Sequence, residues 1–322
     1  MARGWEQNYR AARTTAGFYP VSGRALTALT GDDRNSFLHG MVVSEVNQAP
    51  ENSWTLSACL TPKGKMLSDL ALYHLPDGIW IETEQTLRET VETTLRRYAL
   101  RAAIELEDLS GRWSILDITG PDAGAFAGEL PEPGQVVQRM LGDRATFLAR
   151  TDRPLQPTLR WLVPAALEAA ASDSLLAGGA TRLEPEPAAA LRMEAGIPVF
   201  GTDVSADNLV LEVPAYRPGI SFEKGCYIGQ ETVARLHARG EKIARNLRGV
   251  LTDPAPEPGS AVMAGGKQVG TITSTTWSPA AGRHLSLAIV HRSAMEHGAV
   301  VEILGTEGTI QGTVTELPIQ DG

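Results

Sequence analysis

Cysteine is scarce in this chain of 322 residues, which has only two, Cys59 and Cys226. They form no Cys-x-x-Cys pair and no apolar stretch follows Met1, so we expect a protein of the reducing cytoplasm and not a secreted, disulfide-rich one. The six histidines show no ligand spacing such as His-Glu-x-x-His. One chain also lacks the four thiolates that surround an iron–sulfur cluster, so we predict that the monomer alone binds no metal.

Long hydrophobic runs and the glycine-rich nucleotide motif are also missing. No apolar segment reaches the roughly 20 residues of a membrane-spanning helix, so no membrane partner is expected. No Gly-x-Gly-x-x-Gly follows a predicted strand, which argues against a dinucleotide-binding fold. With 43% hydrophobic residues, 21% charged residues and a formal charge of −9, the chain has the composition of a globular protein of two or three domains, not of a general nucleic-acid binder.

The hydrophobic pattern of the first two thirds of the chain mixes strands and helices. Alternating residues predict strands, and a stripe of apolar residues predicts a helix over 85–100. The expected strands are 54–60, 66–75, 78–83, 102–109, 113–118, 136–141, 145–150 and 158–163, and the further helices are 122–130, 165–176 and 187–195. This order, with hairpin-like returns, predicts an α+β fold of antiparallel, ferredoxin-like sheets covered on one face by helices.

The last part of the chain has a different pattern. A proline-rich turn at 253–259 precedes short alternating segments that are separated by glycines. These segments are 268–274, 285–290, 300–304 and 309–316. Short strands at regular spacing predict a small β-barrel or sandwich that begins near Asn246.

The segment 224–231, Lys-Gly-Cys-Tyr-Ile-Gly-Gln-Glu, concentrates the chemistry of the chain. A nearby cation, a helix N-terminus and exposure to water each lower the pKa of a thiol, and Lys224, a helix that begins at Gln230 and two flanking glycines could supply all three for Cys226. We therefore predict that Cys226 is the reactive residue and Lys224 its activating partner. The alternative is a small buried hydrophobe, which is our prediction for Cys59 in its alternating strand.

Residues 224–248 are locally basic within an acidic chain. The basic strip consists of Lys224, Arg235, Arg239, Lys242, Arg245 and Arg248, against Glu231 and Glu241. Such a strip can attract an anionic ligand, RNA or an acidic protein through its field. A solvated helix face and strand edge would explain it equally well.

Two short segments carry further candidates. Residues 30–33 have the spacing of a capping box, which predicts a short helix, and His39 follows beside a glycine. His39 is either a ligand contact or a partly buried histidine satisfied by backbone. On the helix 187–195, Arg192 and Glu194 are two residues apart, so they point to different faces and one of them should face a site or another domain.

Four segments together form a recognisable set, because they occur in one order and at one spacing across the whole chain. They are 29–40, 61–69, 191–198 and 224–231. In this respect the chain resembles the YgfZ family, the folate-binding relatives of the glycine-cleavage aminomethyltransferase. Lys-Gly-Cys-Tyr-Ile-Gly-Gln-Glu is the most specific segment, and the others are persuasive only in combination.

The resemblance implies a three-lobed, cloverleaf-like α+β fold around a central channel for tetrahydrofolate, with a C-terminal β-barrel. The lobes would be 1–50 with 111–245 around the channel, 51–110 as a ferredoxin-like unit, and 246–322 as the barrel. It also implies a role in the assembly or repair of iron–sulfur enzymes, including tRNA-modifying ones, with client or assembly proteins as partners. The signature loop would consist of Lys224, Gly225, Cys226, Tyr227, Gly229, Gln230 and Glu231, with Arg192 and Glu194 near the channel.

Folate binding sets its own physical requirements. A pterin edge offers N–H donors to a carboxylate, which Glu194 or Asp69 could supply, and the glutamyl tail needs cations such as those from Arg235 onward. The sequence does not choose between the two acids. The chain departs from the aminomethyltransferases at 150–156, where they carry a Thr-Gly-Tyr-Thr-Gly-Glu type segment that grips the pterin, and it has Ser44-Glu45 where many relatives have Asn-Asp.

Three functions remain open at this point. The favoured one is a folate-binding accessory factor, not a classical enzyme, that uses Cys226 in thiol or cluster chemistry. The second is a folate-dependent aminomethyl or one-carbon transferase, in which Cys226 is dispensable and Asp69 orients the folate nitrogen. The third is a module that binds RNA or an acidic protein through Arg235 and Arg239, with strong sensitivity to salt.

Overall fold

The structure is a computed structural model that describes residues 4–128, 130–151, 154–240, 243–306 and 308–319. The chain divides into two compact units. The first unit comprises residues 1–63, 67–184 and 218–230, and the second comprises 64–66, 185–217 and 231–322. Among the described residues, no helix has the length and apolar character needed to cross a membrane.

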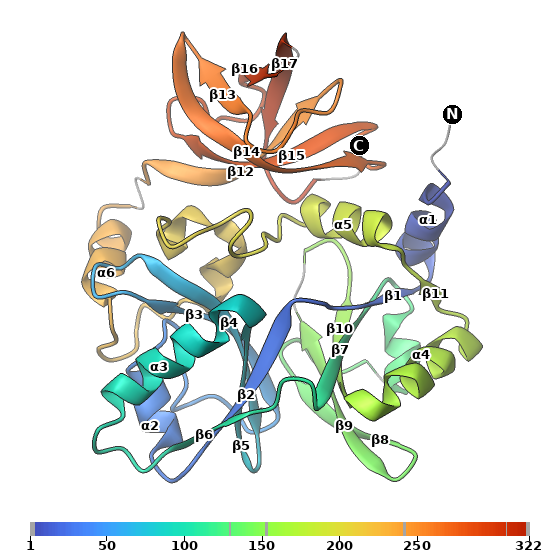
Figure 1. The fold of residues 1–322 in the computed structure, drawn as a ribbon, viewed down its shortest axis with the longest axis vertical. Helices are drawn as coiled ribbons and strands as arrows, with labels where there is room; N and C mark the ends of the chain where they lie inside the picture. Colours follow the sequence, from blue (N-terminus) through green and yellow to red (C-terminus); the bar gives the residue numbers. More distant parts are fainter. Residues whose placement is uncertain (1–3, 129, 152–153, 241–242, 307, 320–322) are drawn as a thin grey trace. The chain divides into compact units, whose positions relative to one another are not determined.

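A five-stranded sheet with the order β3-β4-β5-β2-β6 lies in the first unit (Figure 1). Its strands are β2 (Arg24–Thr30), β3 (Ser53–Leu60), β4 (Met66–Leu75), β5 (Gly78–Glu84) and β6 (Glu105–Asp108). β2 pairs antiparallel with β5 and β6, and β4 pairs antiparallel with β5. Helices α2 (Arg34–His39) and α3 (Arg88–Tyr98) bury Leu38, Val91 and Leu95 in one cluster with the apolar residues on one face of this sheet.

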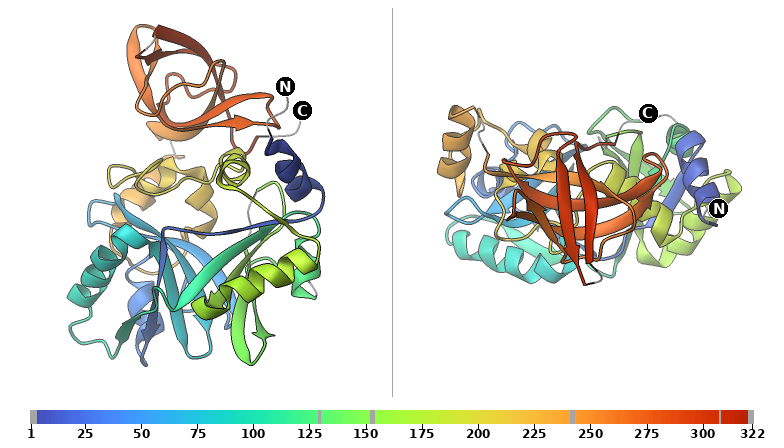
Figure 2. Two further views of the ribbon diagram at one scale, coloured as in Figure 1. Left: turned by 45° about the vertical axis from the view of Figure 1, so that its right-hand side comes forward. Right: turned by 90° about the horizontal axis from the view of Figure 1, so that it is seen from above.

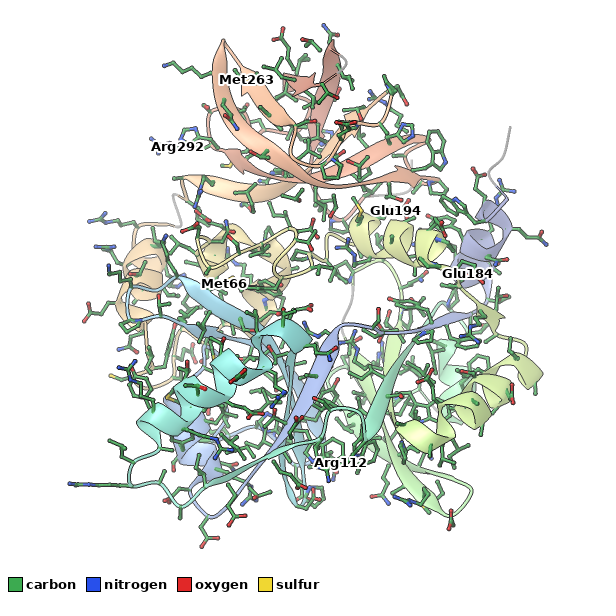
Figure 3. The ribbon with its side chains drawn as sticks, viewed as in Figure 1. Met66, Arg112, Glu184, Glu194, Met263 and Arg292 are labelled. Carbon is green, nitrogen blue, oxygen red and sulfur yellow. The ribbon has the colours of Figure 1, made fainter. Side chains whose placement is uncertain are left out.

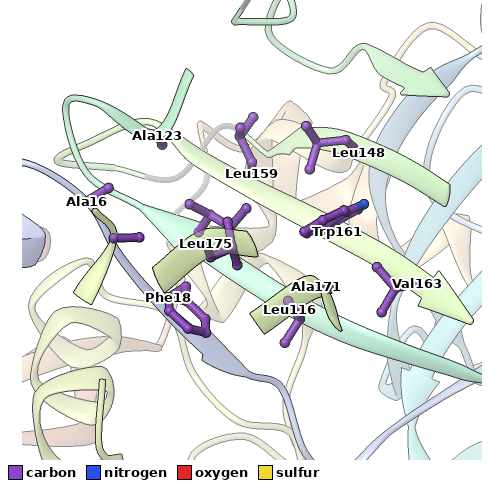
Figure 4. Close-up of a cluster of buried hydrophobic side chains, with 12 residues drawn as sticks. Ala16, Phe18, Leu116, Ala123, Leu148, Leu159, Trp161, Val163, Ala171 and Leu175 are labelled. Carbon is purple, nitrogen blue, oxygen red and sulfur yellow. The ribbon is translucent and has the colours of Figure 1, made fainter. Parts of the chain in front are cut away.

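A six-stranded sheet with the order β11-β1-β7-β10-β9-β8 completes the core of the first unit. Its strands are β1 (Gly17–Pro20), β7 (Trp113–Thr119), β8 (Val136–Leu141), β9 (Arg144–Thr151), β10 (Thr158–Pro164) and β11 (Thr181–Arg182). The β1–β11 pair is parallel, whereas β1 with β7, β10 with β7 and β9, and β8 with β9 are antiparallel. Helix α4 (Glu168–Ala177) places Ala171 and Leu175 against Phe18, Leu116 and Trp161 (Figure 4).

The two sheets of the first unit share a buried apolar cluster. Tyr73 and Trp80 of the five-stranded sheet belong to the same cluster as Ala149 and Leu162 of the six-stranded sheet. The ring of Trp80 also meets the rings of Trp113 and Phe147 edge to face, with centroids 4.6 and 5.3 Å apart. Each such aromatic pair contributes about 0.5–1.5 kcal/mol beyond the burial of its area. The contact between the sheets is therefore part of the core.

The second unit contains a closed barrel, shown in two further views in Figure 2. Its strands are β12 (Arg245–Thr252), β13 (Ala261–Ala264), β14 (Lys267–Ser278), β15 (Arg283–His291), β16 (Val300–Gly305) and β17 (Gly308–Thr315). β12 pairs with both β15 and β17, so the sheet closes and leaves no unpaired edge. Inward-facing Val250, Val262, Ile303 and Val314 form its core. Helix α5 (Pro185–Glu194) belongs to the same unit.

The α+β class and the C-terminal barrel are confirmed, and β4 and β8 match their predicted ranges. Three local details differ. The helix expected at 122–130 is a short 3₁₀ helix, Ala123–Ala127. No strand is predicted at the position of β2, which joins the sheet of β3 to β6. A short helix does follow 30–33, but Asp33 accepts a hydrogen bond from the backbone N–H of Ala103 and does not cap α2. The boundaries of the three lobes stay a prediction.

The remaining helices are short. α1 (Glu6–Thr14) precedes the first strand, and α6 (Gln230–Ala238) follows the signature segment. Further 3₁₀ helices are Gln85–Leu87, Ala165–Leu167, Val210–Glu212 and Pro214–Gly219.

Candidate functional site

The side chain of Lys224 is held by backbone carbonyl groups. Its Nζ donates to the carbonyl oxygens of His39, Val42 and Ser44 at 2.6, 2.9 and 2.6 Å. The last carbonyls of a helix have no partner within the helix and carry partial negative charge, so the end of α2 is a favourable place for a cation. All three N–H donors of the ammonium are thereby used. Lys224 fastens the signature loop to the segment after α2.

Burial changes the titration of this lysine and of the aromatic ring beside it. Nζ of Lys224 lies 5.1 Å from the ring centroid of Tyr227. Loss of solvent lowers the pKa of Lys224 to about 8, although Glu45 acts in the opposite direction. Burial likewise raises the pKa of the Tyr227 hydroxyl to about 12. The loop therefore combines one half-buried cation with a neutral phenol.

Further backbone contacts fix the rest of the loop. The N–H of Ile228 donates to the carbonyl of Gly40 at 3.2 Å, and the N–H of Tyr227 donates to Oε1 of Gln230 at 3.1 Å. Gly229 has a backbone φ of +82°, a conformation that residues other than glycine rarely adopt. α6 begins immediately afterwards, at Gln230. Cys226 stands at the middle of this pinned loop and is exposed to solvent.

His39 and Glu45 lie against the same loop. Nδ1 of His39 is 3.2 Å from Oε1 of Glu45 and 3.4 Å from the backbone N of Asn47. Burial, and then the charge of Lys224, lowers the pKa of His39 against the opposing effect of Glu45. Burial acts to raise the pKa of Glu45, but the hydrogen bond from the N–H of Gln48 and the charges of His39 and Lys224 lower it. The imidazole is thus the neutral partner of an ionised carboxylate.

A second polar group of the first unit is a buried cluster centred on Arg24. Its Nε donates to Oε1 of Glu82 at 2.8 Å, and its Nη1 is shared by Asp69 and Glu84 at 3.1 and 3.0 Å. Burial acts to lower the pKa of Arg24, but the three carboxylates outweigh it and the pKa is raised. Burial raises the pKa of Glu84, although Arg24 opposes it.

Arg160 extends this cluster to the other sheet. It donates to Glu82 at 2.6 Å and to both oxygens of Asp117 at 2.8 and 2.9 Å, while the hydroxyl of Tyr73 donates to Glu82 at 2.6 Å. Burial acts to raise the pKa of Glu82, but Arg160 and Arg24 lower it more strongly. In this Arg24 cluster, two guanidinium groups face four carboxylates. Its formal charge is negative, which suits a ligand with N–H donors.

Arg192 and Glu194, both predicted near a folate channel, lie in the second unit and are engaged there. Glu194 lies on α5 (Figure 3), is fully buried, and accepts hydrogen bonds from Oγ of Ser278 and the N–H of Ala280. Arg192 donates to the carbonyl of Ile197 and to Oδ2 of the buried Asp203. Both side chains take part in contacts that hold the second unit together. Their folate role stays a prediction.

Several cations of the basic strip are already engaged in hydrogen bonds or ion pairs. Lys224 is held in the first unit as described above, while Arg245 pairs with the buried Glu212 and Arg248 donates to the carbonyl of Met295 in the second. Glu231 and Arg235 are exposed on α6, and Arg239 is exposed directly after its end. Lys242, Glu241 and residues 152–153 lie outside the described residues. Of the described cations, Arg235 and Arg239 are therefore the ones to test for a partner.

Asp69 is predicted from the sequence as a site residue, but its buried partners are not. The signal that could have found them is a single charged residue inside an otherwise apolar strand, as for Glu82, Asp117 and Arg160. A strand buried on both faces cannot expose such a charge, so the charge must be paired within the core. Ser44 and Glu45 were likewise not connected to Lys224. Among the described residues, no group of three or more His, Cys, Asp or Glu side chains is arranged to hold a metal ion.

Comparison with known proteins first defines the class of this protein. The family model of the GCVT N-terminal domain matches residues 1–136, and that of the glycine cleavage T-protein C-terminal barrel domain matches residues 245–321. The glycine cleavage system aminomethyltransferase T from Bartonella henselae has a similar solved structure, with a TM-score of 0.84. The structural match covers 98% of this chain and 89% of the Bartonella henselae chain, at 19% sequence identity. It therefore shows a shared fold.

Sequence relatives then give the family. The chain is 33% identical to the tRNA-modifying protein YgfZ of Escherichia coli strain SE11 over 220 residues, which are 67% of this chain and 66% of that protein. The YgfZ proteins of Escherichia fergusonii and Shigella boydii match it at the same identity. The chain thus spans about two thirds of the length of the curated relatives it matches. It belongs to the YgfZ family, and the resemblance predicted from the four segments is confirmed.

Proposed function

We propose that this protein is a folate-binding accessory factor that supports iron–sulfur enzymes, including tRNA-modifying ones, through the thiol of Cys226. Membership of a family whose members carry the name tRNA-modifying protein supports the link to tRNA modification. The likeness to an aminomethyltransferase supports a folate ligand through the fold alone. The specific assignment to residues rests on the geometry of the first unit.

The observation that carries the folate proposal is the sharing of one guanidinium nitrogen by two carboxylates. Asp69 and Glu84 both accept a hydrogen bond from Nη1 of Arg24. Their side chains are 11% and 15% exposed, so each is largely buried but can still be reached by a ligand. A pterin edge offers several N–H donors in one plane, and a carboxylate accepts two of them at once. The Arg24 cluster has four carboxylates and two guanidinium groups, so it offers acceptors for the N–H groups of a pterin. Asp69, and not Glu194, is therefore the acid that we assign to folate.

The exposure of Cys226 supports an accessory role that uses its thiol. Cys226 lies on a loop that Lys224 fixes to backbone, while the other thiol, Cys59, is buried and has a pKa raised to about 12 by burial. A buried thiol with such a pKa is not a nucleophile near neutral pH. Thiol or cluster chemistry at this protein must then use Cys226. A cluster ligated by Cys226 would need further ligands from a client protein.

The test is a rescue experiment in cells that lack the endogenous relative. The activity of iron–sulfur enzymes and the level of their tRNA modifications are compared for wild type, Cys226→Ser and the matched control Cys59→Ala. We expect rescue by wild type and by Cys59→Ala, and none by Cys226→Ser at equal protein level. Equal rescue by Cys226→Ser would remove the thiol from the function and favour one-carbon transfer. Failure of wild type to rescue would overturn the accessory role.

A further inference from the structure

The signature loop is attached to the segment after α2 on both sides of Cys226. Two residues before the cysteine, Lys224 reaches the carbonyl of His39, and two residues after it, Ile228 donates to the carbonyl of Gly40. Two residues of chain span at most about 7 Å, so Cys226 cannot move far from the second of these attachments. The backbone of Cys226 is therefore restrained near the end of α2 and the residue after it, whatever the rotamer of its thiol.

The imidazole of His39 faces this stretch of the loop. A Cβ atom built on Gly225, the residue before Cys226, would lie 3.9 Å from Nε2 of His39. On the other side of the ring, Nδ1 faces the carboxylate of Glu45 at 3.2 Å. The backbone N–H of Asn47 also points at Nδ1, from 3.4 Å, but the carboxylate lies nearer and can only accept a hydrogen bond. When Nδ1–H donates to this carboxylate, the lone pair of the ring is on Nε2, on the side of the loop. One nitrogen is thus held by an acid, and the other is presented to the segment that carries the thiol.

The surroundings of His39 suit a proton acceptor. The charged groups that act on its ring are Glu45, from the segment after α2, and Lys224, from the loop. Burial and Lys224 keep the ring neutral, so it can take a proton, and Glu45 stabilises the imidazolium that would form. A cysteine, a base and an acid that orients the base are the three parts of an activated thiol.

We propose that His39, oriented by Glu45, is the base that deprotonates Cys226. The thiol turns about its single side-chain torsion, the S–H bond breaks, and the proton passes to Nε2 of His39. The products are a thiolate on Cys226 and an imidazolium whose Nδ1–H is held by Glu45. This inference rests on the proposed use of Cys226 as the reactive group. It names a base that the sequence left undecided between a ligand contact and a structural histidine.

The test measures how fast iodoacetamide alkylates Cys226 in the full chain across the neutral pH range, with the modified peptide quantified by mass spectrometry. Relative to wild type, His39→Gln should lower the rate at about pH 7 by about tenfold and change the shape of the rate–pH profile. Glu45→Gln should change it in the same direction by less. His291→Gln, an exposed histidine of the barrel, is the matched control and should leave the profile unchanged.

A rate–pH profile of His39→Gln that coincides with that of wild type would overturn the proposal. The buried Cys59 reports folding in the same sample, because its alkylation would reveal an unfolded variant. A second measurement needs no change at His39. The nuclear magnetic resonance titration of the His39 ring is compared between wild type and Cys226→Ser, and the proposal requires the two curves to differ, whereas identical curves would contradict it.

These outcomes are separable from those of the rescue experiment. A thiol whose alkylation depends on His39, in a protein whose Cys226→Ser variant still rescues cells, would overturn the proposed function alone. A thiol that cells require, but whose alkylation ignores His39, would overturn this inference alone.

Discussion

Arg160 connects the two sheets of the first unit through Glu82: its Nη1 donates to Oε1 of Glu82 at 2.6 Å, and the Glu82 side chain is fully buried. Glu82 also accepts from Arg24 and Tyr73. One carboxylate on β5 therefore compensates two guanidinium groups, one of them on β10 of the other sheet. The cost of removing these ions from water is offset only while every partner is present. Loss of the charge on Glu82 would therefore leave two buried guanidinium groups without their shared acceptor.

Glu82→Gln should destabilise the protein by about 3–5 kcal/mol, because Arg24 and Arg160 both lose a charged acceptor inside the core. Urea unfolding followed by tryptophan fluorescence measures the change. Arg112→Gln is the control, since Arg112 and Glu107 form a pair whose side chains are 52% and 64% exposed. Loss of that pair should cost less than about 1 kcal/mol. Similar losses from both substitutions would show that the buried pair has no special weight.

Asp69→Asn and Glu84→Gln should each weaken tetrahydrofolate binding about tenfold or more, because each removes a charged acceptor for the pterin N–H groups. Isothermal titration under anaerobic conditions gives the dissociation constants. Asp77→Asn, in the exposed turn between β4 and β5, is the matched control and should bind as wild type does. Unchanged affinity in both cluster variants would place the folate elsewhere. Absence of binding by wild type would overturn the folate proposal itself.

Lys224→Met should loosen the signature loop, because three carbonyl oxygens lose their donor at once. Hydrogen exchange detects this directly: the amide of Ile228, which bonds to Gly40, should exchange faster in the variant. Lys267→Met, on an exposed residue of β14, should leave exchange in the loop unchanged. A loop that stays equally protected without Lys224 would show that the backbone contacts alone hold it.

The two thiols should differ sharply in reactivity. Cys226 is exposed, whereas burial raises the pKa of Cys59 to about 12. A disulfide reagent added to the native protein should therefore modify one thiol rapidly and the second only after unfolding in denaturant. Cys226→Ser should abolish the rapid phase, and Cys59→Ala should preserve it. Rapid reaction of both thiols in the native wild-type protein would contradict the burial of Cys59.

His74 should make the protein sensitive to acid. Burial lowers its pKa from 6.5 to about 4, and within the described residues its Nε2 has no hydrogen-bond partner. A folded-state pKa below the unfolded one means that the unfolded chain binds more protons between these values, so stability is full above about pH 6.5 and falls as the pH drops toward 4. The loss should approach about 3 kcal/mol. His74→Leu should reduce the slope of unfolding free energy against pH, and an unchanged slope would rule His74 out as its source.

The sequence by itself determined the elements of the fold to a large extent. Period-two alternation predicted most strands of both units, since a strand with one buried face must alternate, and glycine turns between short strands predicted the barrel. β2 was missed, because its run Ala25-Leu26-Thr27-Ala28-Leu29 is buried almost throughout and shows no alternation. The signature segment was also recognisable from its residues alone, because lysine, cysteine and glycine at fixed positions carry a specific chemistry.

Only the tertiary structure decided which side chains meet. Lys224 and the carbonyls of His39, Val42 and Ser44 are about 180 residues apart in the chain, and no local pattern marks a backbone carbonyl as an acceptor for a distant ammonium group. The same holds for Arg24 and Arg160, whose shared acceptor Glu82 lies on a third strand. A charged residue within an apolar strand indicates that a partner must exist in the core. Which residue is that partner depends on sheet order and strand register, which the sequence pattern leaves open.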